Sequence, residues 1–325
     1  MESITKNRQS AAALRAMVAR AYGPDEVCDG EDWAGELGNG CFNVVYRIRL
    51  RSGTQAVLKI APPPDVEVLT YERGAMATEL AALRLVREHT KVPVPEVEFA
   101  DRSQEVCDAA YFFMSYVDGD DLHTLRDTLT DAEKEAYDER LGAITRELNS
   151  IPGPAFGPLT GPGTRTWRPA FLRMVDELLR DGERRGIALP CGYDLIRGLV
   201  AAHADALDEV TEPRFVEWDL WSGNCMVRDG RVVAIVDHER AFYGDPLMEF
   251  GFAGCESSAF GDSTAFLRGY GHPPLTEPER IRRRLYNLHL ALVLCIETTY
   301  RAYSDDGHYD WACGHLRETV ALLGG

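Results

Sequence analysis

The sequence predicts an α+β protein of two lobes, a small β-rich lobe followed by a larger and mainly helical one. The chain has 325 residues, of which 45% are hydrophobic, and this is enough for more than one compact core. Most strand-like patterns lie before residue 118, whereas helix-capping patterns and long helical stretches dominate after it. We therefore expect lobes over residues 1–117 and 118–325.

The first lobe is expected to hold two helices and a meander of strands. Apolar residues recur at helical spacing over 10–22, until Gly23-Pro24 ends the pattern. Residues 44–50 partly alternate apolar and polar side chains, and Ser52-Gly53 then predicts a turn. The further elements expected here are a strand over 55–60, a helix over 72–88, and strands around Val97 and over 111–117.

Helix-capping pairs mark the second lobe. Thr130 with Glu133, and Thr276 with Glu279, have the spacing of a capping box ahead of long helical stretches. The strongest β pattern in this half covers residues 225–236. We therefore expect a mainly helical lobe that contains one prominent hairpin.

Asp229-Gly230 divides this β pattern into two apolar-rich runs and predicts a two-residue hairpin turn. Pairing the strands outward from the turn places Asn224 opposite Ile235. Because neighbouring strands lie about 4.8 Å apart, Asn224 and Asp237 are expected at the same open end of the hairpin. Asp219, five residues before Asn224, is carried back over that end by the loop.

These three polar side chains suit phosphoryl transfer. The reaction needs an acceptor for the proton of the attacking hydroxyl, and oxygen ligands that hold Mg²⁺ against the β- and γ-phosphates. Asp219 is the candidate base, and Asn224 and Asp237 are the candidate metal ligands. The sequence thus predicts an enzyme that moves the γ-phosphate of ATP or GTP onto a hydroxyl of a small molecule.

The first lobe supplies candidate nucleotide contacts. A glycine-containing loop between two predicted strands is expected to fold over phosphates, and it holds Gly38, Gly40 and Asn43. Asn43 replaces the third glycine of the kinase pattern, and asparagine tolerates a positive φ. Lys59, on the next strand, is placed to pair with the α- and β-phosphates. Glu79, on the helix that follows, is expected to hold Lys59 by an ion pair, with Glu72 as the alternative.

The order of these features resembles the aminoglycoside phosphotransferase family, a branch of the protein-kinase-like fold that also contains choline and fructosamine kinases. The resemblance runs from about Trp33 to Tyr303. Its motifs are the loop 38–45, Ala-Val-Leu-Lys at 56–59, Val-Pro-Val-Pro at 92–95, Met-Ser-Tyr-Val-Asp-Gly at 114–119, Asp-Leu-Trp-Ser-Gly-Asn at 219–224, and Ile-Val-Asp at 235–237 leading into Gly-Asp-Pro at 244–246. The segment 219–224 is similar to the fructosamine kinase version, whereas the likeness to aminoglycoside enzymes depends more on 244–246.

The resemblance implies a protein-kinase-like two-lobe fold with a hinge at about 114–118. The hinge backbone that would hydrogen-bond the adenine of ATP belongs to Met114, Ser115, Tyr116 and Val117. Asp245 would brace the loop that precedes it. Two residues depart from the family pattern, since Glu217 stands where histidine is usual and Glu249 where aspartate is frequent. We expect altered bracing of the catalytic loop and retained activity.

The C-terminal helices shape the acceptor cleft in this family, often with carboxylates that hold amine groups of an antibiotic. The candidates here are Glu256, Glu297, Tyr300, Asp305 and Asp306, with Tyr303 beside them. The resemblance therefore implies a polar or cationic small-molecule acceptor, such as an aminoglycoside, and a role in antibiotic resistance. Two alternatives stay open: a metabolic kinase for a sugar amine, a choline-like amine or a nucleoside, and a nucleotide-binding regulatory module without turnover.

Bulk composition narrows the partners further. The formal net charge of −17 would repel nucleic acids and anionic membranes over most of the surface. Residues 1–10 lack the apolar core of a signal peptide, and the eight cysteines include no Cys-x-x-Cys pair, so we expect reduced thiols and a cytoplasmic location. The arginine-rich run 280–284 is expected to be solvated around a helix.

Overall fold

The chain forms two compact units in the computed structural model, which describes all residues except 1–2, 31, 39, 41, 303–305 and 325. Unit 1 comprises Met1–Val68, Pro95–Asp118 and Tyr300–Ser304, and unit 2 comprises Leu69–Val94, Gly119–Thr299 and Asp305–Gly325. The units interleave along the chain, whereas the expected lobes 1–117 and 118–325 are contiguous. The division into a nucleotide-binding lobe over 1–117 and an acceptor-binding lobe over 118–325 stays a prediction.

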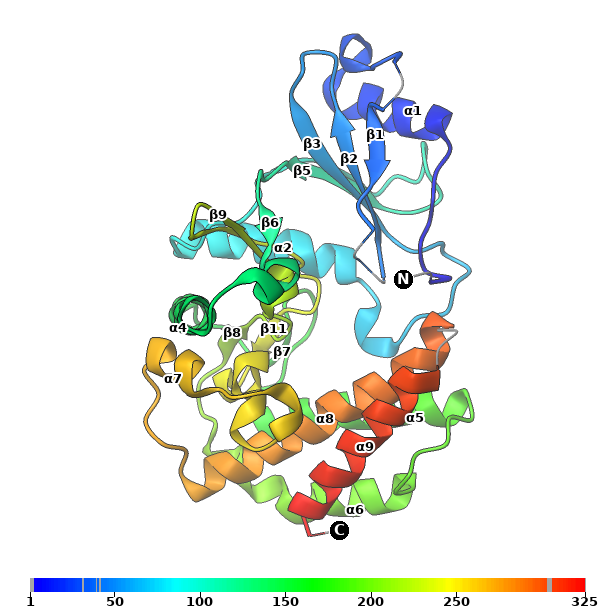
Figure 1. Cartoon of the computed structure of the whole chain (residues 1–325). Helices are drawn as coiled ribbons and strands as arrows, with labels where there is room; N and C mark the ends of the chain where they lie inside the picture. Colours follow the sequence, from blue (N-terminus) through cyan, green and yellow to red (C-terminus); the bar gives the residue numbers. More distant parts are fainter. Residues whose placement is uncertain (1–2, 31, 39, 41, 303–305, 325) are drawn as a thin grey trace. The chain divides into compact units, whose positions relative to one another are not determined.

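Unit 1 is built on one antiparallel sheet (Figure 1). Its strand order is β1-β2-β3-β5-β4, and the strands are β1 (Ala34–Glu36), β2 (Val44–Arg49), β3 (Gln55–Ile60), β4 (Val97–Asp101) and β5 (Tyr111–Ser115). Helix α1 (Ala11–Tyr22) buries Leu14, Met17 and Val18 in the core that this sheet shares. These three apolar residues recur at helical spacing, so one face of α1 covers the sheet. The meander expected over 44–60 is confirmed.

Unit 2 contains two small sheets. One has the order β10-β9-β6, and its strands are β6 (Asp120–Asp121), β9 (Cys225–Arg228) and β10 (Arg231–Ile235). The other has the order β7-β11-β8, and its strands are β7 (Gly157–Pro158), β8 (Arg214–Val216) and β11 (Phe242–Gly244). The loops that join β8 to β9 and β10 to β11 carry Asp219 and Asp237, so both sheets anchor the candidate catalytic residues.

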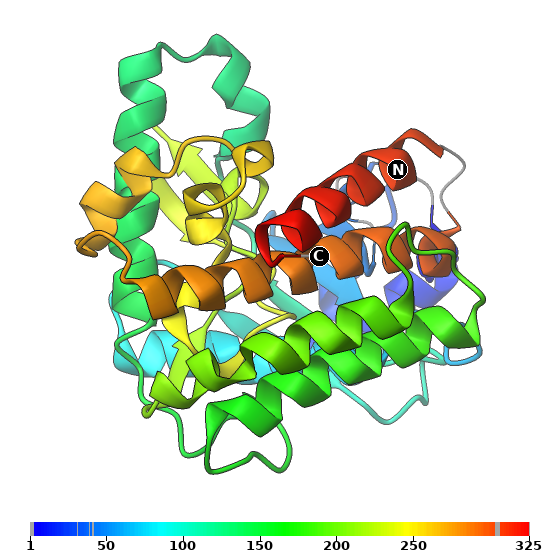
Figure 2. The same ribbon diagram turned by 90° about the horizontal axis from the view of Figure 1, so that it is seen from below.

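Helices make up about half of unit 2. They are α2 (Ala75–His89), α3 (Leu122–Leu125), α4 (Asp131–Leu148), α5 (Trp167–Arg184), α6 (Tyr193–His203), α7 (Thr264–Tyr270), α8 (Glu277–Arg301, whose last two residues count with unit 1) and α9 (Asp306–Leu322). Figures 1 and 2 show α5 and α6 side by side. The β-rich unit and the helical unit confirm the predicted fold class.

Local signals set where several helices begin. The Thr130 hydroxyl accepts the Glu133 N–H at 3.3 Å, while the Glu133 carboxylate accepts the Thr130 N–H at 2.8 Å, which completes the predicted capping box. The helix expected over 72–88 instead starts at Ala75 and follows a short 3₁₀ turn. Gly74 has a φ of 81°, and this left-handed residue separates the turn from the helix.

Two arginines expected at the surface are buried instead. The side chain of Arg282 is 8% exposed and pairs with Asp245 at 2.9 Å and with Glu209 at 2.9 Å. Arg283 is also buried, and it donates to the carbonyl oxygen of Leu247 and to Asn287. A buried guanidinium needs such partners because desolvation of an unpaired charge is costly. The prediction of a solvated arginine run was therefore wrong at these two positions.

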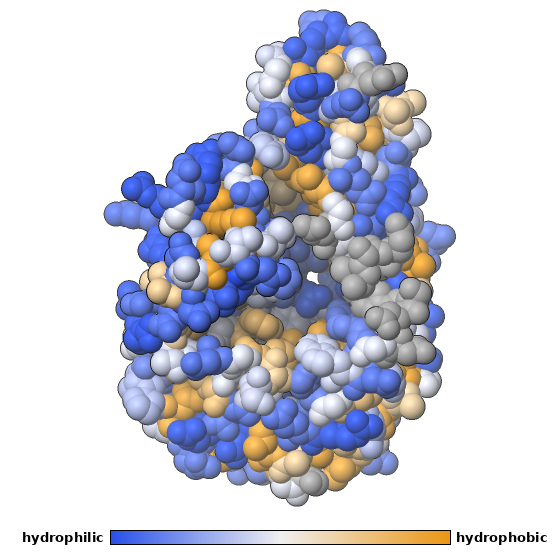
Figure 3. Space-filling model, in the orientation of Figure 1, coloured by the Kyte–Doolittle hydropathy of each residue, from blue (hydrophilic) through white to orange (hydrophobic). Residues whose placement is uncertain are grey.

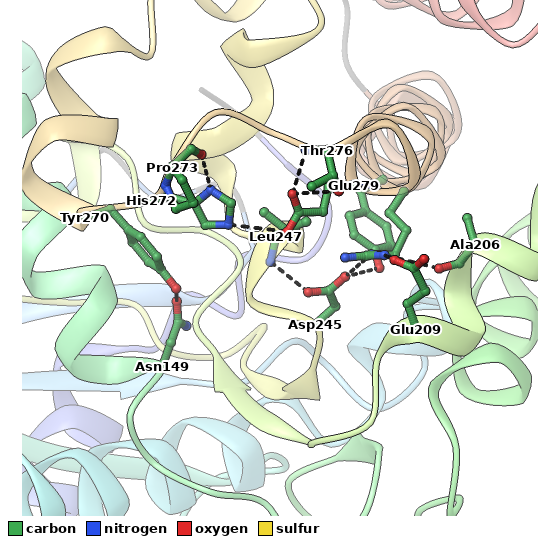
Figure 4. Close-up of polar contacts among 12 residues, drawn as sticks. Asn149, Ala206, Glu209, Asp245, Leu247, Tyr270, His272, Pro273, Thr276 and Glu279 are labelled. Atoms are coloured by element: carbon green, nitrogen blue, oxygen red, sulfur yellow. Dashed lines mark hydrogen bonds and ion pairs between the residues drawn. The ribbon is translucent and has the colours of Figure 1, made fainter.

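Asp245 is the centre of this buried network (Figure 4). Its carboxylate accepts the Leu247 N–H at 3.1 Å and the Tyr286 hydroxyl at 2.6 Å, in addition to Arg282. These contacts tie the loop after β11 to α8. Bracing of the catalytic loop by Asp245 stays a prediction.

The face of the molecule in Figure 3 is largely hydrophilic. Figure 3 shows apolar residues in small groups among many hydrophilic ones on the described part of one face. Among the described residues, no helix combines the length and apolar character that crossing a bilayer requires. The seven described cysteines are free thiols.

Candidate active site

The hairpin of β9 and β10 carries the predicted metal ligand Asn224 at its start. Asp229 and Gly230 have φ values of 51° and 72°, as a type I′ turn requires. Arg228 pairs with Arg231 next to the turn, as expected. The hairpin and its turn are thus confirmed.

The register further from the turn differs from the prediction by one residue. A bulge between Val232 and Ala234 shifts the pairing, so Ile235 lies opposite Cys225 and not opposite Asn224. The Val236 N–H consequently donates to the Asn224 carbonyl at 3.0 Å. The bulge therefore places Asn224 opposite the residue that directly precedes Asp237.

The loop around Asp219 is held by its own backbone and by Asn224. The Asn224 side-chain amide donates to the Asp219 carbonyl at 2.8 Å, and the Trp221 N–H donates to the same oxygen at 3.1 Å. The Asp219 N–H donates to the Glu217 carbonyl at 2.8 Å. Because Asn224 uses its amide nitrogen here, its amide oxygen is the atom left to ligate a cation.

Glu249 braces this loop from the opposite side. Its carboxylate accepts the N–H groups of Glu217 and Trp218, each at 2.9 Å, and the Asn149 side-chain amide at 2.7 Å. Trp218 has a φ of 63°, a conformation that a bulky residue adopts only when its surroundings hold it. Burial raises the pKa of Glu249 to about 8. The glutamate at this family-variant position thus contacts the catalytic loop directly.

A buried pair connects the two loops that carry the predicted catalytic and metal-binding residues. His238 Nδ1 lies 2.9 Å from Glu217 Oε1, and both side chains are about 1% exposed or less. Glu217 precedes Asp219 by two residues, and His238 directly follows Asp237. We did not predict this contact from the sequence, because the two residues lie far apart in the chain.

Asp219 has the electrostatics of a base that works near neutral pH. Burial raises the pKa of Asp219 to about 6, the nearby Arg240 guanidinium opposes this rise, and the carboxylates of Asp237 and Glu297 add to it. A carboxylate with a pKa close to the working pH combines a useful ionised fraction with a real affinity for the proton.

Arg240 is a site residue for which the sequence raised no expectation. Its Nε lies 3.8 Å from Asp219 Oδ2, and its Nη2 lies 3.5 Å from Glu297 Oε2. The guanidinium also lies over the rings of Tyr71 and Trp218, at 5.6 and 5.4 Å from their centroids. The one signal in the sequence was its place three residues after Asp237.

Carboxylates gather where a divalent cation would bind. Oxygens of Glu79, Asp237 and Glu239 lie within 4.8 Å of one another. Asp237 has a φ of 68°, which an aspartate tolerates better than most residues do. Oxygen ligands of this kind suit Mg²⁺, so the residues present fit the expected ion. Asp237 and Asn224 stay predicted ligands, and Glu239 joins them as a candidate.

The predicted nucleotide contacts of unit 1 lie on its sheet and in one loop. Lys59 is buried on β3, opposite Val45 on one side and Phe112 on the other. Asn43 is 4% exposed and does not have the positive φ that we considered for it. Gly38 and Gly40 are described, whereas Asn39 and Cys41 lie outside the described residues.

The remaining nucleotide assignments stay predictions. Met114 and Ser115 end strand β5, and Tyr116 and Val117 follow it, half-buried. The contact of their backbone with adenine stays a prediction. The same holds for the ion pair between Lys59 and Glu79, because these residues belong to different units.

The predicted acceptor residues are largely engaged by arginines of the chain. Glu256 pairs with Arg280 and Arg284, at 2.8 Å each, and Glu297 pairs with Arg240. Tyr300 is fully buried on α8. Tyr303 and Asp305 lie outside the described residues, as does the side chain of Asp306. Binding of an amine by these residues stays a prediction.

Comparison with known proteins agrees with this geometry. Residues 33–285 match the model of the phosphotransferase enzyme family. The curated relatives include two subtelomeric hrmA-associated cluster proteins from Aspergillus fumigatus, each 28% identical over 134 residues. The match covers 41% of this chain and spans about a quarter (26%) of the length of each relative.

Solved structures show the same fold at low identity. A thermostable mutant of aminoglycoside phosphotransferase APH(4)-Ia, in a ternary complex with AMP-PNP and hygromycin B, aligns with a TM-score of 0.65 and 17% identity over 96% of this chain and 99% of that chain. A candidate fructosamine-3-kinase from Thermobifida fusca aligns with a TM-score of 0.62 and 23% identity over 95% and 100% of the two chains. The family match covers most of the sequence, including every candidate catalytic and metal-binding residue, and the chain belongs to the phosphotransferase enzyme family.

Proposed function

We propose that this protein transfers the γ-phosphate of ATP or GTP to a hydroxyl group of a small polar molecule in the cytoplasm. The observation that carries the proposal is the convergence of Asp219, Asn224 and Asp237. A hydrogen bond of 2.8 Å joins Asn224 to Asp219, and one of 3.0 Å places Asn224 opposite the neighbour of Asp237. A candidate base and candidate metal ligands are thereby held by one short segment and one hairpin.

Each residue has a defined part in the proposed reaction. Asp219 would accept the proton of the attacking hydroxyl and orient that oxygen toward the phosphate. Asn224 and Asp237, with Glu239, would hold Mg²⁺, which when bound neutralises charge on the β- and γ-phosphates. Lys59 would neutralise the α- and β-phosphates, and the backbone of the loop at Gly38 and Gly40 would cover them.

Two classes of acceptor follow from different observations. Two similar structures support an aminoglycoside acceptor, because one of them is a complex with hygromycin B and another is a complex with streptomycin. An antibiotic acceptor of this kind would give the protein a role in resistance. The ion pairs of Glu256 and Glu297 with arginines instead favour an acceptor with little positive charge, such as a sugar or a nucleoside. Among the predicted carboxylates, Glu297 would bind an amine only by giving up part of its contact with Arg240.

A coupled assay of ADP release against a panel of acceptors tests the proposal. The panel should contain aminoglycosides, nucleoside antibiotics, sugar amines and neutral sugars. Asp237→Ala is the matched inactive variant, and we expect it to abolish turnover and to weaken magnesium-dependent nucleotide binding while the fold is kept. Unchanged turnover in a folded Asp237→Ala protein would refute the metal site, and activity confined to metabolites would refute the resistance role.

A further inference from the structure

The buried pair of Glu217 and His238 stands between the two loops on which the proposed chemistry depends. Glu217 belongs to the segment that leads from β8 to Asp219, and His238 belongs to the segment that leads from β10 past Asp237. The side chains meet at 2.9 Å and are 1% and 0% exposed. The pair is therefore a direct polar link between these loops inside unit 2.

Glu217 depends on His238 for its polar environment. Both carboxylate oxygens are buried and accept no hydrogen bond of good geometry from the described residues, so the 2.9 Å contact with the His238 ring is their close polar contact. A buried carboxylate without a partner is strongly disfavoured, because it loses its hydration and gains nothing in return. The position of Glu217 is thus set by the position of the histidine ring.

The histidine ring is fixed from its other side. His238 Nε2 lies 3.2 Å from the carbonyl oxygen of Ile235, and a carbonyl can only accept, so Nε2 carries a hydrogen. Ile235, His238 and Glu217 therefore form a continuous chain of polar contacts.

The backbone of Glu217 passes this constraint on to the catalytic loop. Its carbonyl accepts the Asp219 N–H at 2.8 Å, and its N–H donates to Glu249 at 2.9 Å. A shift of the Glu217 side chain would accordingly move the peptide groups that orient Asp219. On the other side of the pair, a shift of His238 would move the residue next to Asp237.

We propose that Glu217 and His238 are positioning residues that set the placement of Asp219 relative to Asp237. This inference rests on the proposed function for the roles of these two aspartates. A buried ion pair adds little net stability compared with an apolar pair of similar volume. What it adds is a fixed separation, since two buried groups of opposite charge stay in contact when no water is there to replace either partner.

The test separates positioning from stability by means of paired variants. His238→Phe keeps a ring but leaves the carboxylate unpaired, and we expect it to lower the melting temperature and the turnover together. The double variant Glu217→Leu/His238→Phe removes the buried charge, so we expect the melting temperature to recover toward that of the wild type. Turnover should stay about 10- to 100-fold low, the usual effect of losing a group that orients a metal site. His238→Asn, which keeps a donor near the position of Nδ1, should retain most of the turnover.

Two further readouts do not depend on an identified acceptor. Calorimetric titration of ADP at several Mg²⁺ concentrations should show that the double variant needs about 10-fold or more Mg²⁺ for the same ADP affinity. Hydrogen exchange of the amides at 217–221 should be faster in the double variant than in the wild type, with or without nucleotide. Tyr111→Phe, which removes the buried hydroxyl bond to Asp101 in unit 1, controls for a comparable loss of one buried polar contact.

The outcomes distinguish this inference from the proposed function. Recovery of turnover, Mg²⁺ dependence and exchange rates along with the melting temperature would overturn the positioning role. Unchanged exchange at 217–221 in the double variant would also overturn it. A folded wild-type protein that binds no ADP in the presence of Mg²⁺ would refute the proposed function, and the exchange measurement would still decide whether the pair orders the loop.

Discussion

Arg240 Nε lies 3.8 Å from Asp219 Oδ2, and the same guanidinium reaches Glu297 at 3.5 Å. The proposed base therefore works beside a fixed positive charge that comes from the loop following Asp237. This charge opposes the effect of burial on Asp219 and engages a carboxylate that we had assigned to the acceptor. We accordingly expect it to influence both the proposed proton transfer and the kind of acceptor that fits.

Asp219→Asn should lower turnover by about 10²- to 10⁴-fold, the usual contribution of a positioned general base. Affinity for Mg-ATP should change little, because Asn224 contacts the backbone carbonyl of residue 219, which the substitution keeps. Steady-state kinetics with ADP calorimetry measures both quantities. A loss of turnover below tenfold would mean that residue 219 orients the acceptor without taking its proton in the rate-limiting step.

Arg240→Gln should move the acid limb of the pH–rate profile to higher pH. Turnover needs ionised Asp219 and so falls as the pH drops through its pKa, which burial raises to about 6. The guanidinium holds that pKa down, so its removal raises the pKa further and extends the inactive range upward. We would measure kcat/KM of the wild type and of the variant between pH 5 and pH 8 at the same ionic strength. An unshifted acid limb would show that Arg240 does not set the charge of the base.

Glu249→Ala should destabilise the protein by about 3 kcal/mol, because it removes three accepted hydrogen bonds at a buried site. Turnover should fall as well, since two of those donors belong to the catalytic loop. Urea unfolding measures the free energy, and Glu135→Ala, at an exposed carboxylate paired with Arg268, is the surface control. A variant as stable as this control would mean that water or another group replaces the lost bonds.

Arg282→Ala should cost about 3 kcal/mol of unfolding free energy or more, because it leaves the buried Asp245 carboxylate without its charged partner. Arg280→Ala is the matched control, since Arg280 belongs to the same arginine run but its side chain is 41% exposed. Thermal or urea unfolding of both variants measures the difference between their free energies of unfolding. If Arg282→Ala and Arg280→Ala were equally stable, the buried ion pair would be contradicted and the solvated arginine expected from the sequence would be supported.

Local patterns in the sequence were sufficient to predict much of the fold and to propose the catalytic residues, whose roles stay predictions. The hairpin turn at Asp229-Gly230 and the capping box at Thr130 depend on residues close together in the chain, so they could be recognised without tertiary information. The spacing of Asp219 and Asn224 is equally local. The assignments of Lys59 and Glu79 also came from sequence patterns, and their ion pair stays a prediction.

Tertiary structure decided the features that depend on residues far apart in the chain. The bulge before Ala234 changed the register by one residue, and nothing in the alternation of apolar residues marked it. The burial of Arg282 depends on Asp245, 37 residues away, and the position of Arg240 depends on Glu297, 57 residues away. From the sequence alone, a charged side chain is expected to be solvated, because its neighbours along the chain offer it no buried partner of opposite charge. Only the folded chain brings the distant carboxylate that makes its burial energetically possible.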